Sequence, residues 1–470
     1  MKVVIVGSGI SGLTTAFAAL RADRQIDLKI LEAEQRIGGT ISTRLEDGCV
    51  IEEGPDSFLT TKPWALELCN MLNLQEQILQ TNNANRRAFI ALNGTLMPLP
   101  EGFMLLAPTK IFPFFDSPIL SVGSKLSGAM ELFRAPVLGD GDETLRSFAV
   151  RRFGQEMFDR IIQPMVAGIY TGDPDKLSAP ATIPQFVEME QRYGSVGRAF
   201  LTGSQTKTTD GGARYSAFIS LKSGLQTLVN ALVDSIGRER IELGCTVKDL
   251  AKSGLRWKVN LSDGRSLDAD AVVFATAASS LSRIMQSTDS ALAADLARVE
   301  YSSSAVLNML FDKRDVERPL DGFGFVVPEI ENKKIIACSF ASTKFPDRAP
   351  ANKVLLRVFL GGALHPEIFA LSDGDLIQAA LVELRTYLGI KRFPQKVWIK
   401  RWTNAMPQYT VGHLKLVEQL KNHFSAHDGL VWTNSALTGV GIPDCVRSGF
   451  EAAQTLRTLA KNVDHSPVKV

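Results

Sequence analysis

The chain has 470 residues, of which 45% are hydrophobic and 22% are charged. At about 150 residues per domain, this length and composition suit a globular protein of several domains with a large buried core. Lysine and arginine number 52 against 50 aspartates and glutamates, a net charge of +2. Because a dedicated nucleic-acid-binding protein carries a clustered basic excess, the sequence argues against that class.

The five cysteines are far apart and never form a Cys-x-x-Cys pair. This spacing argues against a disulfide framework or a cysteine-based zinc site and fits a reducing compartment. His423 and His427 are four residues apart but lack the glutamate of a His-Glu-x-x-His motif, so we expect a solvated helix end there. We therefore predict no metal site.

No signal peptide is expected, because Met1 and Lys2 lead directly into the strand-like run Val3–Val6. The most apolar stretch, 102–120, contains three prolines and two charged residues. It is therefore not expected to span a membrane. We expect it either to cover a hydrophobic site or to rest on a membrane surface.

The first elements in chain order predict a βαβ unit. Residues 2–6 read as a buried strand, 11–20 as a close-packed helix and 27–31 as a second strand. Because parallel neighbours need a helical crossover, this start predicts a parallel sheet.

Between about 85 and 215, helical patterns alternate with proline-rich loops; the clearest are 143–153 and 155–166. Strand patterns then return, and the Asp263-Gly264 pair after the strand 257–261 predicts a hairpin. A tail after Lys461 is expected to fray. The further predicted elements are strands at 270–275, 305–311, 324–327, 354–360 and 430–433, and a helix from 444 to 459.

The segment Gly7-Ser8-Gly9-Ile10-Ser11-Gly12 follows the first strand and opens a helix. Its glycines permit a tight turn, a close approach of a pyrophosphate and packing of the helix on the strand, while the helix start offers free N–H groups. Glu32 ends the second strand, 20 residues after Gly12, at the spacing expected for a carboxylate that binds a ribose hydroxyl. Together these features predict a dinucleotide site.

A second segment, Glu32-Ala33-Glu34-Gln35-Arg36-Ile37-Gly38-Gly39, carries an arginine that can neutralise a diphosphate and a Gly-Gly turn that can pass close to a flat ring. An ordinary exposed loop is the alternative. The turn Gly54-Pro55-Asp56-Ser57 is a further place where the chain can approach the same ligand. Gly441-Ile442-Pro443-Asp444 starts a late helix, whose N-terminus can stabilise negative charge on a bound ring, or is a plain strand-to-helix turn.

The first two segments together resemble the flavin-containing amine oxidase superfamily, which binds FAD through these elements. The stretches 53–58, 164–178, 406–413 and 439–445 are similar to the porphyrinogen oxidases of haem biosynthesis. The resemblance covers essentially the whole chain. It is closest to the soluble bacterial type that acts on coproporphyrinogen III, and protoporphyrinogen IX oxidases are close relatives.

The resemblance implies a mixed α/β fold like that of amine oxidases, with non-covalent FAD. It implies a discontinuous Rossmann-like FAD-binding domain (1–60, 221–280 and 415–470), a β-rich substrate-binding domain (61–85 and 281–414) and a helical domain (86–220) as the candidate for membrane-surface contact. The implied FAD-binding residues are Gly7, Ser8, Gly9, Ile10, Ser11, Gly12, Glu32, Ala33, Arg36, Gly38, Gly39, Gly54, Pro55, Asp56, Ser57, Val247, Trp402, Gly441, Ile442, Pro443 and Asp444.

The resemblance also implies substrate-binding residues. Gly168 matches a position whose backbone carbonyl meets pyrrole N–H groups, and Ile169 and Tyr170 belong to the same stretch. Lys62 is expected to pair with a propionate. Taken alone, Gly168 also reads as a helix C-cap, Lys62 as a surface lysine and Trp402 as a core aromatic. No catalytic side chain is assigned, because the flavin performs the chemistry.

The implied activity is the oxidation of a porphyrinogen by dioxygen, with hydrogen peroxide as by-product. The resemblance further implies a cytoplasmic monomer or homodimer that makes at most peripheral contact with a membrane. It also implies ferrochelatase as a candidate partner. Two rival functions stay open. One is an amine or amino-acid oxidase on the same fold, and the other is a non-catalytic porphyrin carrier.

Overall fold

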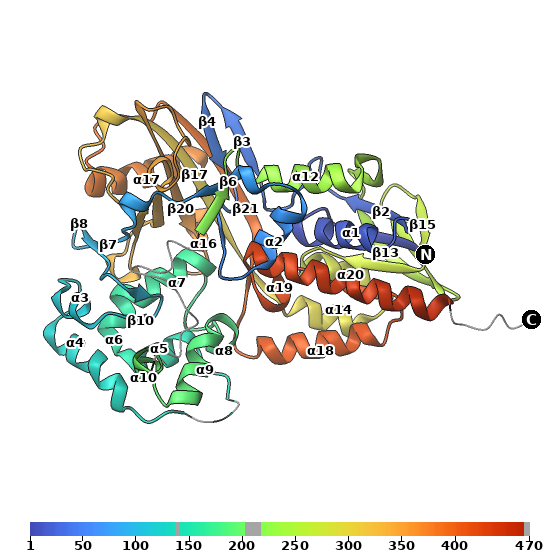
Figure 1. Cartoon of the computed structure of the whole chain (residues 1–470), viewed down its shortest axis with the longest axis horizontal. Helices are drawn as coiled ribbons and strands as arrows, with labels where there is room; N and C mark the ends of the chain where they lie inside the picture. The colour runs from blue at the N-terminus through green and yellow to red at the C-terminus, as the bar shows by residue number, and fades with distance from the viewer. Residues whose placement is uncertain (138, 140, 203–217, 465–470) are drawn as a thin grey trace, which may run out of the picture.

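The two ends of the chain and a middle segment build one parallel sheet. The computed structural model describes residues 1–137, 139, 141–202 and 218–464. Figure 1 shows this sheet toward the end of the molecule that holds the N-terminus. The predicted strands and the parallel βαβ start are confirmed. In spatial order the strands are β12 (Ile241–Leu243), β2 (Asp27–Glu32), β1 (Lys2–Val6), β16 (Ala271–Phe274) and β22 (Leu430–Trp432).

Alternate residues of β1 face opposite sides of the sheet. Val3 to Val6 are all buried, so both faces of the sheet are covered. Val3 and Ile5 pack with helices α1 (Ile10–Ala22), α12 (Gln226–Ile236) and α20 (Ile442–Asp464). Val4 and Val6 pack on the opposite face. The elements on that face are α13 (Ala278–Met285), α14 (Ser290–Ala297), α18 (His413–Ser425) and a small sheet that begins with β13 (Val247–Ser253).

The predicted hairpin at Asp263-Gly264 is confirmed, but its second strand, 266–269, was not predicted from the sequence. β14 (Arg256–Leu261) pairs antiparallel with β15 (Ser266–Ala269) and with β13. The strand predicted at 270–275 follows directly as β16 but pairs parallel with β1. The chain therefore passes from the small sheet to the large one within two residues of Ala269.

A seven-stranded sheet forms the second layer system (Figure 1). Helix α17 (Asp373–Leu388) packs on one face through Leu376, Ala380 and Leu384. The three strands predicted between 305 and 360 are confirmed. Two further strands, β7 (Phe89–Leu92) and β8 (Thr95–Pro98), fall within 86–220, so the sheet extends into the range assigned to the helical domain. The domain boundaries stay a prediction. In order the strands are β21 (Lys396–Gln408), β17 (Glu300–Asp312), β20 (Lys353–Gly361), β19 (Ile335–Phe340), β18 (Gly324–Val326), β7 (Phe89–Leu92) and β8 (Thr95–Pro98).

Helices gather beside this sheet, and the helix predicted at 143–153 is α5 (Leu145–Phe153). The one predicted at 155–166 is divided into α6 (Gln155–Met157), a π-helical turn η4 (Phe158–Ile162) and α7 (Gln163–Tyr170). Pro164 lacks the N–H that a continuous α-helix needs, so the hydrogen-bond pattern changes before it. The other helices here are α3 (Ile111–Asp116), α4 (Val122–Ala129), η3 (Met130–Phe133), α8 (Ala179–Thr182), α9 (Pro184–Tyr193) and α10 (Val196–Leu201).

Short elements connect these layers. They are β3 (Thr43–Glu46), β4 (Cys49–Glu52), β5 (Phe58–Leu59), α2 (Trp64–Met71), η1 (Gln75–Gln77), β6 (Ile78–Gln80), η2 (Asn83–Asn85), β9 (Phe103–Met104), β10 (Ala107–Pro108), β11 (Phe218–Leu221), η5 (Arg238–Arg240), η6 (Lys313–Asp315), η7 (Glu329–Glu331), α15 (Ala341–Lys344), α16 (Pro366–Phe369) and α19 (Ser435–Thr438).

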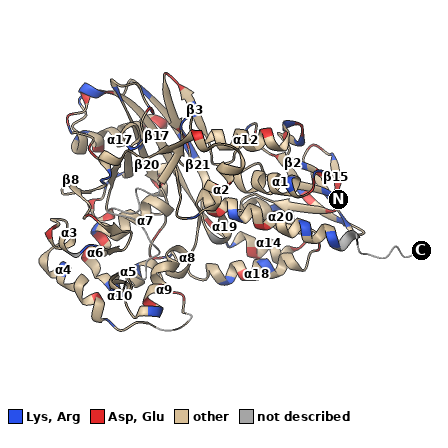
Figure 2. Ribbon diagram, in the orientation of Figure 1, with Lys and Arg blue, Asp and Glu red and all other residues tan. Residues whose placement is uncertain are grey.

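Within the described residues, no helix combines the length and the apolar character needed to cross a bilayer. The same residues contain no cluster of three or more metal-ligating side chains, and the five cysteines are buried and free. Figure 2 shows both signs of charge interspersed along the ribbon. Helix α20 runs to Asp464, beyond the predicted start of fraying, and the rest of that predicted tail lies outside the described residues.

Candidate functional site

The turn between β1 and α1 forms the base of the candidate nucleotide site. Gly7 has a φ of +106°, which residues with a side chain rarely adopt, and a Cβ at Gly12 would lie 2.2 Å from the carbonyl oxygen of Gly7. At Gly9 a Cβ would meet only the Cα of Gly39, at 3.9 Å, among the described atoms. α1 begins at Ile10 without a side-chain cap, so its first N–H groups are available to an anion.

Glu32 turns its carboxylate toward this turn. Oε2 accepts hydrogen bonds from the backbone N–H and the hydroxyl of Ser8, at 2.8 and 2.6 Å, and Oε1 accepts one from the N–H of Glu34 at 2.9 Å. The carbonyl of Glu32 accepts a bond from the N–H of Cys245 at 2.8 Å. This bond brings the start of β13, where buried Val247 lies, to the same edge of the sheet.

The Gly38-Gly39 turn lies against the first glycine turn. The N–H of Gly38 donates to the carbonyl of Ser8 at 3.0 Å, and a Cβ at Gly39 would lie 3.0 Å from the Cα of Gly9. Ala33, at the start of this segment, is exposed. The two sequence motifs, predicted separately, therefore form one continuous backbone surface.

Arg36 is held beside this surface. Its guanidinium donates to the carbonyls of Ile41, at 2.9 Å, and Gly39, and lies 5.8 Å from the centre of the Trp402 ring. Its buried Nε donates no hydrogen bond to any described residue, and an oxygen of Glu34 is 3.9 Å away. A partly buried guanidinium whose Nε has no partner among the described residues is suited to a further anionic ligand such as a diphosphate.

The turn Gly54-Pro55-Asp56-Ser57 closes another side of the site. A Cβ at Gly54 would lie 1.8 Å from the carbonyl oxygen of Thr40 and 3.6 Å from the Trp402 ring. The indole N–H of Trp402 donates to the carbonyl of Glu53 at 2.7 Å. Trp402 is only half-buried, so it braces this turn and is not a core residue.

The N-terminal ends of α20 and α1 meet at the site. The hydroxyl of Ser11 donates to the carbonyl of Cys445 at 3.1 Å, and Gly441-Ile442-Pro443-Asp444 leads into α20. The buried carboxylate of Asp444 accepts hydrogen bonds from the ammonium of Lys62 at 2.6 and 2.8 Å. Lys62, which was predicted to bind the substrate, thus pairs with Asp444, which was predicted to bind the cofactor.

A cavity with an empty volume of about 920 Å³, partly open to solvent, lies between α7, β18–β20 and the turn after Gly54. Gly168 and Ile169 line this cavity together with Asp56, which was predicted among the cofactor residues. Tyr170 is not among the lining residues; its hydroxyl donates to the carbonyl of Thr182 at 3.0 Å. The other lining residues are Ala88, Met165, Phe218, Phe323, Gly324, Phe325, Val326, Ala337, Cys338, Ser339, Lys344, Arg357 and Phe359.

The interpretation of Gly168 as a helix C-cap is wrong. Gly168 lies inside α7, which ends at Tyr170 and is capped by Thr171 in the left-handed conformation, with a φ of 46°. A Cβ at Gly168 would lie 3.6 Å from Val326, an ordinary contact. Neither helix geometry nor packing therefore requires a glycine at this place.

Lys344 and Arg357 are charged cavity residues that the sequence analysis missed. The ammonium of Lys344 lies 2.9 Å and a guanidinium nitrogen of Arg357 3.1 Å from the carboxylate of Asp56. Burial by itself raises the pKa of Asp56, but these two cations hold that pKa well below its usual range, so Asp56 is ionised. A signal for Arg357 was present, since it interrupts an otherwise apolar predicted strand, 354–360.

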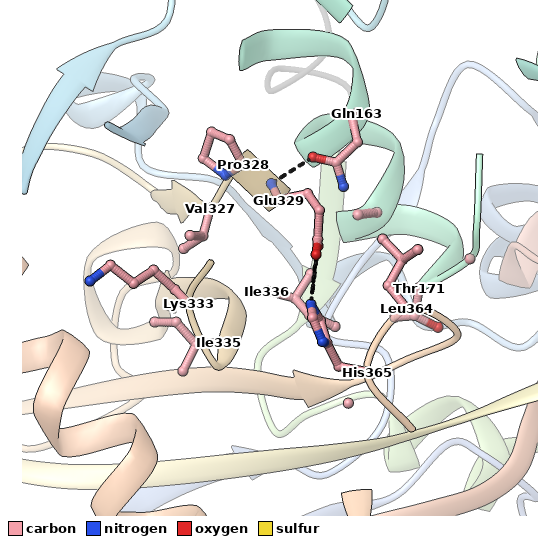
Figure 3. A pocket seen from close by; sticks show the side chains of 13 residues that line it. Gln163, Thr171, Val327, Pro328, Glu329, Lys333, Ile335, Ile336, Leu364 and His365 are labelled. Atoms are coloured by element: carbon pink, nitrogen blue, oxygen red, sulfur yellow. Dashed lines mark hydrogen bonds and ion pairs between the residues drawn. The ribbon is translucent and has the colours of Figure 1, made fainter. Parts of the chain in front are cut away.

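A second pocket, whose empty volume of about 380 Å³ includes open solvent, meets the opposite face of α7 at Gln163 and Ala167. Figure 3 shows the carboxylate of Glu329 directed toward His365, at 2.9 Å, and the side chain of Gln163 accepting the Glu329 N–H at 3.0 Å. None of the predicted site residues lines this cavity.

Comparison with known proteins matches most of the chain to a family. The family described as flavin containing amine oxidoreductase matches residues 10–457. Coproporphyrinogen III oxidase of Bacillus subtilis (strain 168) is 35% identical over 466 residues, covering 97% of this chain and 98% of that protein. Protoporphyrinogen oxidase 1, chloroplastic, of Arabidopsis thaliana is 29% identical over 96% of this chain and 87% of its own length. A solved structure of a protoporphyrinogen oxidase candidate from Exiguobacterium sp. 255-15 has a TM-score of 0.87 at 30% identity, covering 97% of this chain and 98% of its own.

The chain therefore belongs to the flavin-containing amine oxidoreductase family. It is an oxidoreductase whose cofactor is a flavin. The residues at the glycine turns fit such a dinucleotide: the backbone is bare at Gly9, the start of α1 is uncapped, and Arg36 keeps a buried free donor among the described residues.

Proposed function

We propose that this protein is an FAD-dependent porphyrinogen oxidase of haem biosynthesis, which converts coproporphyrinogen III to coproporphyrin III in preference to protoporphyrinogen IX. The observation that carries the proposal is the similarity, over nearly the full length, to a protein named coproporphyrinogen III oxidase. Dioxygen takes up the electrons in successive two-electron steps and leaves as hydrogen peroxide.

The proposed roles follow the candidate nucleotide site at the glycine turns and the large cavity beside α7. Non-covalently bound FAD would supply the chemistry that removes electrons from the porphyrinogen. Ser8, Glu32 and Arg36 would hold its ribose and diphosphate, and the N-terminal end of α20 would stabilise negative charge on its ring. The cavity beside α7 receives the macrocycle, whose apolar faces suit its four phenylalanines. The regions built on the parallel and the seven-stranded sheets act as the FAD-binding and substrate-binding domains.

Steady-state rates on coproporphyrinogen III and protoporphyrinogen IX, measured with one preparation, test the proposal. The preparation is expected to be yellow, to release all its FAD on denaturation, and to produce peroxide with a higher kcat/KM on coproporphyrinogen III. Oxidation of amines without porphyrinogen turnover would make it an amine oxidase. Photoreduced protein that is not reoxidised by air would indicate a carrier.

Gly168→Ala should raise the KM for coproporphyrinogen III without loss of folding stability. Alanine favours a helix interior over glycine by about 1 kcal/mol, and the new Cβ meets only an ordinary contact at Val326. On the cavity side, the methyl group would keep the pyrrole N–H groups from the Gly168 carbonyl. Equal KM values for variant and wild type, with an unchanged melting temperature, would show that no substrate approaches this residue.

Lys62→Ala should raise the KM for coproporphyrinogen III about two- to tenfold, because a partly exposed ion pair contributes little more than about 1 kcal/mol. FAD content is expected to stay unchanged, and Lys62→Glu should raise the KM further by repulsion. Because Lys62 also pairs with Asp444, the variant could instead lose FAD at an unchanged KM. That result would contradict the prediction and would mean that Lys62 positions Asp444 and does not bind the substrate.

We also propose that an apolar surface on α3, α4 and η3 contacts membranes. Its residues Phe112, Val122 and Phe133 are 89%, 73% and 71% exposed. Replacing all three with serine should abolish co-sedimentation with phospholipid vesicles while porphyrinogen turnover in solution persists. The matched control is Leu255→Ser, which removes a 95% exposed side chain from the β13–β14 turn. Equal co-sedimentation of the triple variant and this control would refute the proposal.

A further inference from the structure

The wall of the large cavity carries three charged side chains from separate elements. Asp56 lies in the turn Gly54-Pro55-Asp56-Ser57, Lys344 ends α15 and Arg357 lies in the middle of β20. Lys344 and Arg357 contact the same carboxylate, at 2.9 and 3.1 Å. With Asp56 ionised, two cations face one anion, and these are the charged residues among those lining the cavity. The wall therefore has a net positive charge in an otherwise mostly apolar space.

The acceptor atoms of Asp56 are already engaged. Oδ1 accepts from the hydroxyl of Ser57 at 2.7 Å and from Lys344 at 3.0 Å, and Oδ2 accepts from Lys344 and lies beside Arg357. A ligand that approaches this wall consequently meets few free acceptors. Lys344 also donates to the Ser57 hydroxyl at 3.2 Å, so the donor without a partner among the described residues belongs to Arg357.

Arg357 supplies such a donor. Its side chain is 4% exposed, and its guanidinium donates to the carbonyl of Gly54 and pairs with Asp56. The Nε atom is buried and donates no hydrogen bond within the described part of the chain. A buried charged donor without an acceptor is costly in a folded protein unless a ligand satisfies it.

We propose that Arg357 and Lys344 bind one carboxylate of the substrate on the inner wall of the cavity, with Asp56 as the residue that positions both cations. The inference rests on the proposed function, because it takes the porphyrinogen as the source of the carboxylate. The residual positive charge suits a single carboxylate, and the phenylalanines around it suit the ring that carries this group.

Binding of oxidised porphyrins to the holoenzyme distinguishes the contribution of the carboxylates to affinity from that of the ring. Coproporphyrin III carries free carboxylates, and its tetramethyl ester carries none. Arg357→Gln and Lys344→Met are each expected to weaken binding of coproporphyrin III about tenfold or more and to leave binding of the ester within about twofold. Arg357→Lys should recover part of the loss, since it restores the charge without the guanidinium. Arg314→Gln, at an arginine that is 77% exposed, is the matched control.

FAD content and melting temperature are measured on the same samples. If Arg357→Gln loses FAD or unfolds, the binding measurements on Lys344→Met decide the question. Lys344 contacts this turn through the side chains of Asp56 and Ser57, whereas Arg357 holds the backbone carbonyl of Gly54. Equal weakening of acid and ester, or no weakening of either, would overturn the inference. Failure of wild-type enzyme to oxidise any porphyrinogen would instead overturn the proposed function, whatever the binding experiment shows.

Discussion

Gly54→Ala is expected to yield protein with at most about a tenth of the wild-type FAD affinity and with a lower melting temperature. The new Cβ would lie 1.8 Å from the carbonyl oxygen of Thr40, so the backbone has to move, and overpacking of this kind costs about 1–3 kcal/mol or more. The turn that moves is also held by Trp402 through Glu53 and by Arg357 through the Gly54 carbonyl. The displacement therefore reaches both the cofactor side and the cavity side.

Flavin absorbance per chain and a thermal melt measure this effect. Gly374→Ala is the matched control, because it makes the same substitution in the first turn of α17 with the nearest described atom 3.8 Å away. That variant should keep its FAD and its stability. A Gly54→Ala protein with full FAD and an unchanged melting temperature would contradict the packing argument.

Glu32→Ala and Arg36→Ala should each raise the dissociation constant for FAD about tenfold or more, with the ratio of the two porphyrinogen rates unchanged in the remaining holoenzyme. A hydrogen bond to a charged group contributes about 1.5–3 kcal/mol, and Glu32 and Arg36 belong to the glycine-turn surface and not to the cavity wall. Their contacts are therefore expected to retain the cofactor without selecting the substrate.

Fluorescence titration of the stripped proteins with FAD gives the dissociation constants. Glu34→Ala is the control for Glu32→Ala, since the Glu34 side chain is 71% exposed and only its backbone N–H reaches Glu32. Unchanged FAD affinity in both variants would contradict the assignment of Glu32 and Arg36 to the ribose and diphosphate of FAD. A changed substrate ratio would place these residues nearer the reacting ring.

The fold at both ends of the chain could be predicted because the signals there are local. The β-branched run at 2–6, the glycine turn after it and the spacing from Gly12 to Glu32 are short-range features. The structure places Glu32 beside this turn, within hydrogen-bond distance of Ser8. The strand 266–269 was missed since its residues alternate without a strong apolar pattern. The break in the helix before Pro164 was missed because its periodicity continues through the π-helical turn.

The candidate site was harder to predict where partners are distant in sequence. Asp56 and Lys344 are separated by 288 residues, and Lys62 and Asp444 by 382. No spacing rule links such pairs, because they meet only through the packing of whole layers. The sequence assigned Asp56 to the cofactor through the turn Gly54-Pro55-Asp56-Ser57, and only the structure shows that Asp56 also lines the large cavity with Lys344 and Arg357.

The contact between Ser11 and Cys445 has a consequence for biosynthesis. The hydrogen bond joins α1 to α20 across 434 residues, so the ribosome has to pass Cys445 before both helix ends of the candidate nucleotide site exist. The N-terminal βαβ unit has to wait, with part of its apolar surface uncovered, until α20 emerges and packs on α1. Stable capture of a flavin at these glycine turns is consequently expected only after α20 has been made, and a bound flavin would report that the chain has folded through that helix.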